Sequence, residues 1–252
     1  MRQGRRIGVV IPALDEERAI GRVVDAIPKW VDDVVVVDNG STDGTARVAA
    51  AHGARVVGEP RRGYGAACLA GVRSALTSAA TRPPDVIVFL DGDFSDDPRE
   101  MAALVAPILD RGIDLVIGSR ALGARERGAL TMQQRLGNAL ICALMRVLHG
   151  ARYTDLGPFR AIRREALERL ALDAAGLGWT VQMQVRAARR GLRIEEVPVT
   201  CRRRAAGRSK VSGTVRGVIG AGTAFLWVIF SEAADAALSR RRTRACRTAP
   251  AR

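Results

Sequence analysis

The chain has 252 residues, of which 48% are hydrophobic and 26% charged, and this balance excludes an intrinsically disordered protein. Its 40 Lys and Arg and 26 Asp and Glu give a formal net charge of +14, which indicates anionic partners: phosphorylated substrates, nucleic acid or an acidic membrane surface. The apolar run after the basic start is too short for a signal peptide, and no run approaches the roughly 18 apolar residues that span a bilayer, so we expect a cytoplasmic protein.

The first half of the chain alternates short apolar runs with helical patterns. Runs rich in Val and Ile predict buried strands at 7–12, 33–38, 54–58, 86–91 and 114–119. Helical patterns between them occupy 15–27, 41–53, 66–76 and 98–112. Such alternation predicts an α/β fold with a doubly wound, mostly parallel sheet flanked by helices. In these sheets ligands bind beyond the carboxyl ends of the strands.

The second half is less regular. Its patterns predict helices at 134–149 and 178–191, and short strands within 154–162 and 192–199. The apolar run Val218 to Phe230 has 13 residues, too few to cross a membrane, and suits a helix that lies on a membrane interface or packs on the domain. We therefore expect an α/β domain at 1–210, an interfacial helix at 211–238 and a disordered basic tail at 239–252.

The strongest local signal is the segment FLDGDFSDD at 89–97. A buried strand delivers Asp91, and Asp93 follows two residues later in the same loop. Carboxylates so spaced can share one hard divalent cation, Mg²⁺ or Mn²⁺, which in turn binds phosphates. Asp96 and Asp97 precede a proline and a predicted helix, where surface carboxylates act as caps. Capping is also the alternative role for the first two carboxylates.

Two further carboxylate clusters follow predicted strands. Asp38 ends the strand at 33–38, where a carboxylate can accept hydrogen bonds from a nucleobase or ribose. In IPALDEE, at 11–17, Glu17 suits the capping of a helix. For Asp15 capping and ligand binding both remain open.

The motifs IPALDEE, VVDNGSTDGT, RRGYGAA, LDGDFSDDP, IGSR, DLGPFRAI and GRSK occur in this order along the chain. Through them the sequence resembles glycosyltransferase family 2, of the GT-A fold, and within it the dolichyl- and polyprenyl-phosphate mannose or glucose synthases. The resemblance, from about residue 7 to about residue 217, implies a metal-dependent inverting enzyme that is peripheral on the cytosolic face of a membrane. Its donor would be a nucleotide-sugar of the GDP-mannose or UDP-glucose type, and its acceptor a polyprenyl phosphate.

The resemblance also implies roles for single residues. The donor would contact Pro12, Ala13, Asp15, Glu16, Asp38, Gly92, Arg204 and Lys210. Asp91 and Asp93 would hold Mg²⁺ or Mn²⁺ on the diphosphate, and Arg120 and Arg135 would face the acceptor phosphate. Asp155 falls where related enzymes carry a candidate catalytic carboxylate.

The role of Asp155 depends on the acceptor. A phosphate monoester is already an anion near neutral pH and needs no strong base, so Asp155 would be dispensable for proton removal. A hydroxyl acceptor needs a base, and Asp155 is then the best candidate. Pairing with Arg160 or capping of a turn is the structural alternative for this carboxylate.

Three positions depart from the family pattern. Ser95 stands where related synthases carry a Gln that contacts the metal, so water would replace that ligand. Gln182 stands where Glu is expected, which removes an acidic group. Leu14 replaces an aromatic residue, which weakens base stacking.

Other functions are compatible with parts of the sequence. A family 2 enzyme with a soluble hydroxyl acceptor agrees with the lack of a long apolar run. Nucleic-acid binding agrees with the charge, but only 4% of residues are aromatic and no recognised motif occurs, so we expect no nucleic-acid partner. A dinucleotide-dependent oxidoreductase would need a GxGxxG motif after the first strand, and GYGAAC at 63–68 lacks the third glycine.

Overall fold

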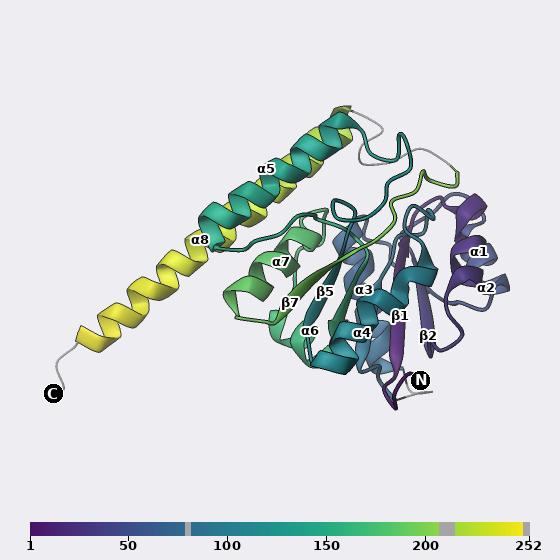
Figure 1. Cartoon of the computed structure of the whole chain (residues 1–252), viewed down its shortest axis with the longest axis horizontal. Coiled ribbons are helices and arrows are strands. Elements are labelled where there is room, and N and C mark those ends of the chain that lie inside the picture. The colour runs from purple at the N-terminus through teal and green to yellow at the C-terminus, as the bar shows by residue number, and fades with distance from the viewer. Residues whose placement is uncertain (79–81, 207–214, 249–252) are drawn as a thin grey trace.

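The computed structural model describes residues 1–78, 82–206 and 215–248, with a seven-stranded sheet at its centre (Figure 1). The strands are β1 (Ile7–Ala13), β2 (Asp33–Asp38), β3 (Arg55–Gly58), β4 (Val86–Phe89), β5 (Leu115–Ser119), β6 (Arg160–Arg163) and β7 (Ile194–Pro198). The helices are α1 (Glu17–Ala26), α2 (Thr45–Ala51), α3 (Tyr64–Thr77), α4 (Met101–Arg111), α5 (Met132–His149), α6 (Arg164–Leu170), α7 (Trp179–Arg189) and α8 (Val215–Thr248). A 3₁₀ turn, Pro98–Glu100, leads into α4.

The strands follow the order β3-β2-β1-β4-β6-β5-β7. The pairs β1–β2, β1–β4, β2–β3 and β5–β7 are parallel, whereas β6 is antiparallel to both β4 and β5. The prediction of a mostly parallel α/β sheet flanked by helices is therefore confirmed. Helix α5 connects β5 to β6 and lies outside the sheet, beside α8 (Figure 1). The chain therefore returns to the sheet at the edge where β5 ends, and β6 runs in the opposite direction to β5.

Alternate side chains of the strands pack on opposite faces of the sheet. On one face Val9 and Ile11 of β1 belong to a buried cluster that includes residues of α1 and α4. On the other face Val10 and Phe89 pack in a second cluster with residues of α3 and α7. Strand β4 ends at Phe89, two residues earlier than predicted, and Asp91 therefore lies in the loop beyond the strand.

Helices α5 and α8 lie side by side along one flank of the molecule (Figure 1). A capping box between Thr131 and Gln134 begins α5, and Gly150 in the left-handed conformation ends it. Met145 of α5 and Val228 and Ile229 of α8 share a third buried cluster with residues of α7. The two helices are thus attached to the sheet domain through α7.

Helix α8 is longer than the sequence pattern predicts. It runs to Thr248, ten residues into the segment expected to be a disordered tail, because that segment is rich in Arg and Ala, which favour helix. The expectation that no segment could span a membrane also needs correction. Residues 217–236 are long and apolar enough to cross one by length and composition, since Ala and Gly extend the 13-residue run past two acidic residues.

Buried ion pairs hold α8 against the domain. Glu232 is buried, and its carboxylate lies 2.5 Å from both the Arg186 Nε and the Arg189 Nη1 of α7. The His149 ring contacts the Ile229 carbonyl at 3.0 Å. Since Arg186 and Arg189 belong to α7, these ion pairs hold α8 against α7 around residue 232.

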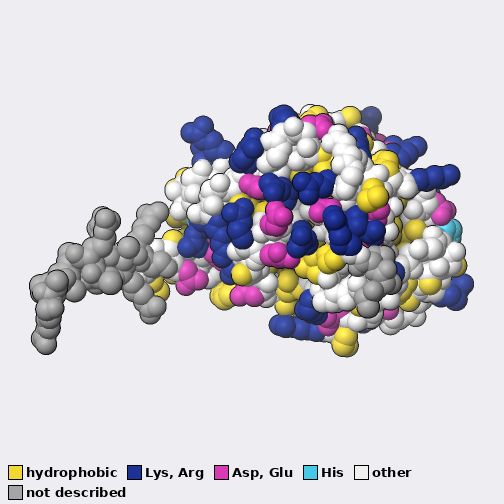
Figure 2. All heavy atoms as spheres, turned by 90° about the horizontal axis from the view of Figure 1, so that it is seen from below, with side chains coloured by type: hydrophobic (Ala, Val, Ile, Leu, Met, Phe, Trp, Pro, Cys, Tyr) yellow, Lys and Arg dark blue, Asp and Glu magenta, His cyan; other side chains and the backbone are white. Residues whose placement is uncertain are grey.

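Positive charge is spread over the surface and mixed with negative charge. Figure 2 shows Lys and Arg side chains interspersed with Asp and Glu on the face viewed from below. Ion pairs such as Arg163–Glu165 and Arg164–Glu168 are typical of the described surface.

Candidate active site

The carboxyl ends of β1, β2, β4 and β5 lie at the same edge of the sheet, because these strands run in one direction. The loops that follow these strands begin at residues 14, 39, 90 and 120 and carry the polar side chains of the site. The sequence prediction that the carboxylate clusters gather at one edge agrees with this topology.

Asp91 and Asp93 occupy the loop between β4 and the 3₁₀ turn. Asp93 is buried, and its Oδ1 accepts a hydrogen bond of 2.8 Å from the Ser95 N–H. Burial and the nearby Asp93 carboxylate raise the pKa of Asp91 to about 7. The ionised form of Asp91 is therefore disfavoured unless a positive charge lies beside it, and a bound cation would supply one.

Arg204 links this loop to the loop after β1. Its Nη1 lies 2.5 Å from the Asp93 Oδ2, and its Nη2 lies 2.6 Å from the Glu16 Oε1. The Ala205 N–H donates a 3.0 Å hydrogen bond to the Asp93 carbonyl. The basic stretch thus delivers one guanidinium between two predicted site carboxylates, whereas Lys210 lies outside the described residues.

The loops after β1 and β2 interlock. Asp15, which has a positive φ of 49°, donates its N–H to the Ser41 Oγ at 2.9 Å and accepts the Thr42 N–H at 2.7 Å. The Asp38 Oδ1 accepts the Ser41 N–H at 3.0 Å. These contacts fix two of the predicted donor-binding carboxylates in a single rim.

The remaining predicted donor positions contribute backbone rather than functional groups. Pro12 and Ala13 end β1, and Ala13 and Gly92 are buried. A Cβ atom at Gly92 would come within 3.3 Å of the Ile20 Cδ1 and 3.6 Å of the Ala13 Cβ. Gly92 therefore lets the Asp91–Asp93 loop approach the end of β1 closely.

Arg120, directly after β5, is paired with Asp155. Its N–H, Nε and Nη2 donate hydrogen bonds of 2.8, 2.8 and 2.9 Å to the carboxylate. Burial acts to raise the pKa of Asp155, but the Arg120 charge and these bonds outweigh it and lower the pKa below its ordinary value. Arg160 is not its partner, because its side chain donates to carbonyls such as those of Gly157 and Thr180.

The predicted capping role is confirmed for Asp97 and wrong for Asp96. Asp97 accepts the Arg99 N–H at 3.1 Å and pairs with Arg202 at 2.7 Å. Asp96 is instead buried, because a backbone bridge pairs it with Cys201. Its two carboxylate oxygens have no hydrogen-bond partner among the described residues, and burial raises its pKa well above the ordinary value.

Tyr64 joins the site, although the sequence pattern does not single it out. Its hydroxyl donates a 3.1 Å hydrogen bond to the Asp91 Oδ1. Burial, followed by the Asp91 charge, raises the pKa of Tyr64 well above the ordinary value, so the hydroxyl keeps its proton. The one signal in the sequence is the glycine on either side of this residue in RRGYGAA.

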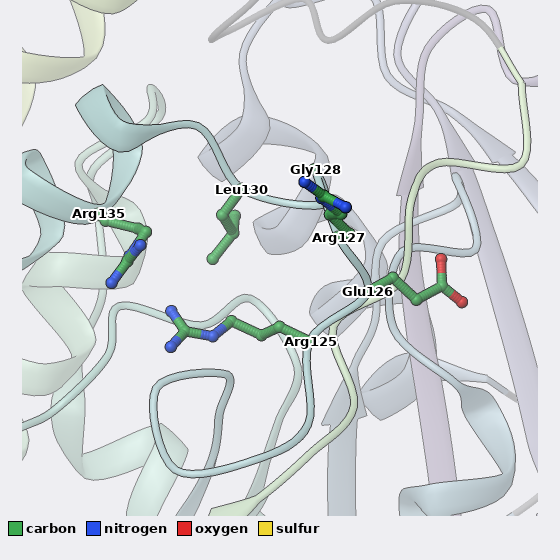
Figure 3. A pocket seen from close by; sticks show the side chains of 6 residues that line it. All are labelled: Arg125, Glu126, Arg127, Gly128, Leu130 and Arg135. Atoms are coloured by element: carbon green, nitrogen blue, oxygen red, sulfur yellow. The ribbon is translucent and has the colours of Figure 1, made fainter.

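Arg135 lies in a separate hollow of about 230 Å³ at the start of α5 (Figure 3). Figure 3 shows the guanidinium groups of Arg125 and Arg135 facing each other, with the Leu130 side chain to one side of them. The hollow is lined by Arg125, Glu126, Arg127, Gly128, Leu130 and Arg135. Arg120 does not line this hollow, so Arg135 is joined there by Arg125 and Arg127, of which the motif pattern gives no sign, and not by its predicted companion Arg120.

Gln182, where an acid was expected, has a structural role. Its Oε1 accepts the N–H groups of Asp173 and Ala174 at 3.0 and 2.9 Å, and its Nε2 donates to the Asp173 Oδ1 at 2.7 Å. A glutamate could accept the two N–H groups but would oppose the Asp173 carboxylate. The amide thus fits this loop better than the acid.

The loop after β4 fits a divalent cation in its donor chemistry. Asp91 and Asp93 offer carboxylate oxygens, the ligands that Mg²⁺ and Mn²⁺ prefer, and a cation would share the Asp93 carboxylate with Arg204. Over the described ranges, no group of three or more His, Cys, Asp or Glu side chains is placed to hold a metal. A cation bound by two carboxylates would complete its shell with water and phosphate oxygens, as Mg²⁺ commonly does.

Comparison with known proteins assigns the chain to a family. Residues 8–171 match the model of glycosyl transferase family 2. An uncharacterised glycosyltransferase of Mycobacterium tuberculosis is 42% identical over 86% of this chain and 94% of its own length. The undecaprenyl-phosphate mannosyltransferase of Micrococcus luteus is 34% identical over 84% of this chain and 90% of its own.

A solved structure resembles the whole arrangement. Glucosyl-3-phosphoglycerate synthase of Mycobacterium tuberculosis, in complex with Mn²⁺, UDP and glucosyl-3-phosphoglycerate, superimposes with a TM-score of 0.71 at 30% identity, over 92% of this chain and 81% of that one. The same synthase is known with Mg²⁺ and UDP. The fold, the family match and the relatives define the class of the protein as a hexosyltransferase. The chain belongs to glycosyl transferase family 2.

Proposed function

We propose that this enzyme is metal-dependent and inverting, and that it moves a sugar from a nucleotide-sugar to a polyprenyl phosphate at a membrane surface. One observation carries the proposal: the arginine hollow opens at the start of α5, where an exposed apolar helix face begins. A polyprenyl phosphate combines the two matching chemistries, an anionic head and a hydrocarbon chain. The mannosyltransferase of Micrococcus luteus, by its name, acts on such a lipid.

The apolar face of α5 continues away from the hollow. Met132, Leu136 and Leu140 are exposed, by 59% to 68%, and their spacing of four residues places them on one side of the helix. Arg135 lies beside Leu136 in the sequence and lines the hollow. A phosphate held by Arg125, Arg127 and Arg135 would place its lipid chain near this face.

The donor would bind along the rim that holds Asp15, Asp38 and Glu16. Asp91 and Asp93 would hold Mg²⁺ or Mn²⁺, which would supply charge neutralisation for the leaving diphosphate. Arg204, already beside both loops, would contribute a second positive charge to the same group. Lys210 stays a predicted donor contact.

Asp155 supports a phosphate acceptor rather than a hydroxyl. Its lowered pKa makes it a weak base, and three hydrogen bonds to Arg120 occupy it. A phosphate oxygen that is already charged can attack the anomeric carbon without losing a proton, while the nucleoside diphosphate leaves from the opposite side. Asp155 would then orient Arg120 toward the acceptor instead of removing a proton.

A peripheral position on the cytosolic face of the membrane agrees with the outer helices. Ile219, Trp227 and Phe230 of α8 are exposed, by 54% to 69%, whereas Glu232 ties the same helix to α7. A helix docked through a buried ion pair and apolar on its outer side suits a membrane surface. The net charge of +14 favours an anionic one.

A soluble acceptor is the second candidate. The superimposable synthase carries glucosyl-3-phosphoglycerate, whose acceptor part is a small phosphorylated acid. The arginine hollow would suit a phosphorylated acid as well. The exposed apolar residues of α5 and α8 favour the lipid.

A transfer assay separates the two acceptors. The protein is incubated with radiolabelled GDP-mannose or UDP-glucose and Mn²⁺, with either a polyprenyl phosphate in detergent or 3-phosphoglycerate, and EDTA controls test the metal. We expect metal-dependent label in the organic phase with the lipid alone. Label only in a water-soluble product would favour the second candidate, and no transfer from any nucleotide-sugar would refute the proposed donor.

A further inference from the structure

Asp91 and Asp93 are supported in different ways. Asp93 is held by the Ser95 N–H and by Arg204. Within the described part of the chain, the Asp91 carboxylate accepts its hydrogen bond from the Tyr64 hydroxyl, at 3.1 Å on Oδ1. The group that contacts this carboxylate thus comes from another element, 27 positions earlier in the chain.

The backbone places Tyr64 rigidly at the start of α3. The Gly63 N–H donates to the Asn39 Oδ1 at 2.8 Å, and the Gly65 N–H donates to the Gly176 carbonyl at 3.1 Å. Gly63 has a φ of 144°, and a Cβ atom there would collide with the Ala175 carbonyl. Glycine on both sides of the tyrosine thus lets α3 begin against the loop at 173–176.

Aromatic packing fixes the ring of Tyr64. Its edge meets Trp179 with ring centroids 6.3 Å apart, and Trp179 in turn meets Phe89 at 4.7 Å. Trp179 is buried, and Phe89 is the last residue of β4, two positions before Asp91. The hydroxyl and the carboxylate are therefore positioned by one continuous packed cluster.

We propose that Tyr64 is a positioning residue for the divalent-cation site: it holds the Asp91 carboxylate through Oδ1 and leaves Oδ2 for the metal. The inference rests on the proposed metal dependence. Hydrogen-bond partners of ligating carboxylates fix ligand orientation, and their loss weakens metal binding by about 10- to 100-fold. A carboxylate released from Tyr64 would rotate and lose this preorganisation.

The test measures Mn²⁺ binding without donor or acceptor. Tyr64→Phe keeps the ring and its packing and removes only the hydroxyl. Tyr153→Phe is the matched control, because Tyr153 also donates its hydroxyl to a buried partner, the Gln184 carbonyl at 2.9 Å, but does not contact Asp91. Free Mn²⁺ is followed by electron paramagnetic resonance, and melting in EDTA shows that both variants fold.

We expect Tyr64→Phe to bind Mn²⁺ about 10-fold more weakly than the wild type and Tyr153→Phe to bind it equally well. Equal Mn²⁺ affinity of Tyr64→Phe and wild type would overturn the positioning role while leaving the metal site intact. A similar loss in both variants would also overturn it, since the effect would then come from general loosening. If the wild type itself binds no Mn²⁺ while binding a nucleotide-sugar in EDTA, the proposed metal dependence fails, and this inference with it.

Discussion

Arg120 donates three hydrogen bonds to Asp155 across 35 residues of chain, and the two side chains differ in exposure. The Arg120 side chain is 20% exposed, whereas that of Asp155 is 3% exposed. The Arg120 side chain is therefore partly open to solvent, whereas the Asp155 side chain is not. The pair presents Arg120 to the site and keeps Asp155 behind it, as expected for a carboxylate that orients an arginine.

Asp155→Asn should destabilise the fold in a pH-dependent way. The pKa of Asp155 is lowered in the folded state, so its stabilising contribution is present above the unfolded pKa of about 3.9 and is lost as pH falls below it. Breaking a buried pair costs about 3 to 5 kcal/mol. Urea unfolding near pH 7 should show such a loss, which should shrink near pH 3.5. The control Glu165→Gln, in the exposed pair with Arg163, should change stability by less than about 1 kcal/mol.

Asp91→Asn should abolish metal-dependent transfer and yet stabilise the metal-free protein at alkaline pH. Because the folded pKa of Asp91 is raised to about 7, the folded state holds this proton more tightly than the unfolded state, and stability falls as pH rises from about 4 to about 7. Asn avoids that loss. In EDTA the variant should melt above the wild type near pH 8, with the gap closing near pH 4. The exposed Asp235→Asn on α8 should show no such gap, and an Asp91→Asn variant that melts below the wild type at both pH values would contradict this account.

Much of the fold and part of the site could be predicted from the sequence, for a local reason. The Val-rich run of β2 and the apolar run of β4 carry their own burial signal, and the residues after them must lie at the carboxyl edge of a parallel sheet. The positions of Asp38 and Asp91 follow from that rule. The contact of Asp91 with Tyr64 does not follow from it, because that contact is set by packing between distant segments.

Three contacts illustrate this limit. Arg204 meets Glu16 across 188 residues, and Tyr64 meets Asp91 only because its helix begins against the 173–176 loop. Asp96 follows a capping pattern in the sequence, yet a bridge to Cys201 buries it. None of these depends on local periodicity, so no pattern within one segment reveals them.

Arg204→Gln should affect metal and donor in opposite directions. The guanidinium pairs with the Asp93 carboxylate at 2.5 Å, so a cation at this carboxylate would compete with it. Removing it should tighten Mn²⁺ binding measured by calorimetry without donor. The same variant should weaken binding of the nucleotide-sugar, because a positive charge on the diphosphate is lost. Arg203→Gln, at the exposed neighbouring position, should change neither, and weaker binding of both ligands would contradict competition.

Arg135→Ala should raise the KM for the acceptor by at least about 10-fold, the cost of one charge-assisted hydrogen bond, with the KM for the donor unchanged. Arg135 lines the hollow, which is separate from the carboxylate loops. Arg146→Ala is the matched control, since Arg146 is exposed on the same helix but does not line the hollow. An equal rise in both constants for Arg135→Ala would argue for a structural role.

The double variant Leu136→Ser and Trp227→Ser should bind phospholipid vesicles less well without loss of fold. Both side chains are largely exposed, at 64% and 69%, so folding gains little from burying them, and their contact with lipid would be lost. Sedimentation with vesicles containing anionic lipid should show the wild type in the pellet and the variant mostly in the supernatant. A variant at the exposed polar position, Gln133→Ser, should sediment like the wild type. If the double variant sediments equally well but transfer to a detergent-dispersed polyprenyl phosphate falls, the apolar face serves the acceptor chain rather than the membrane.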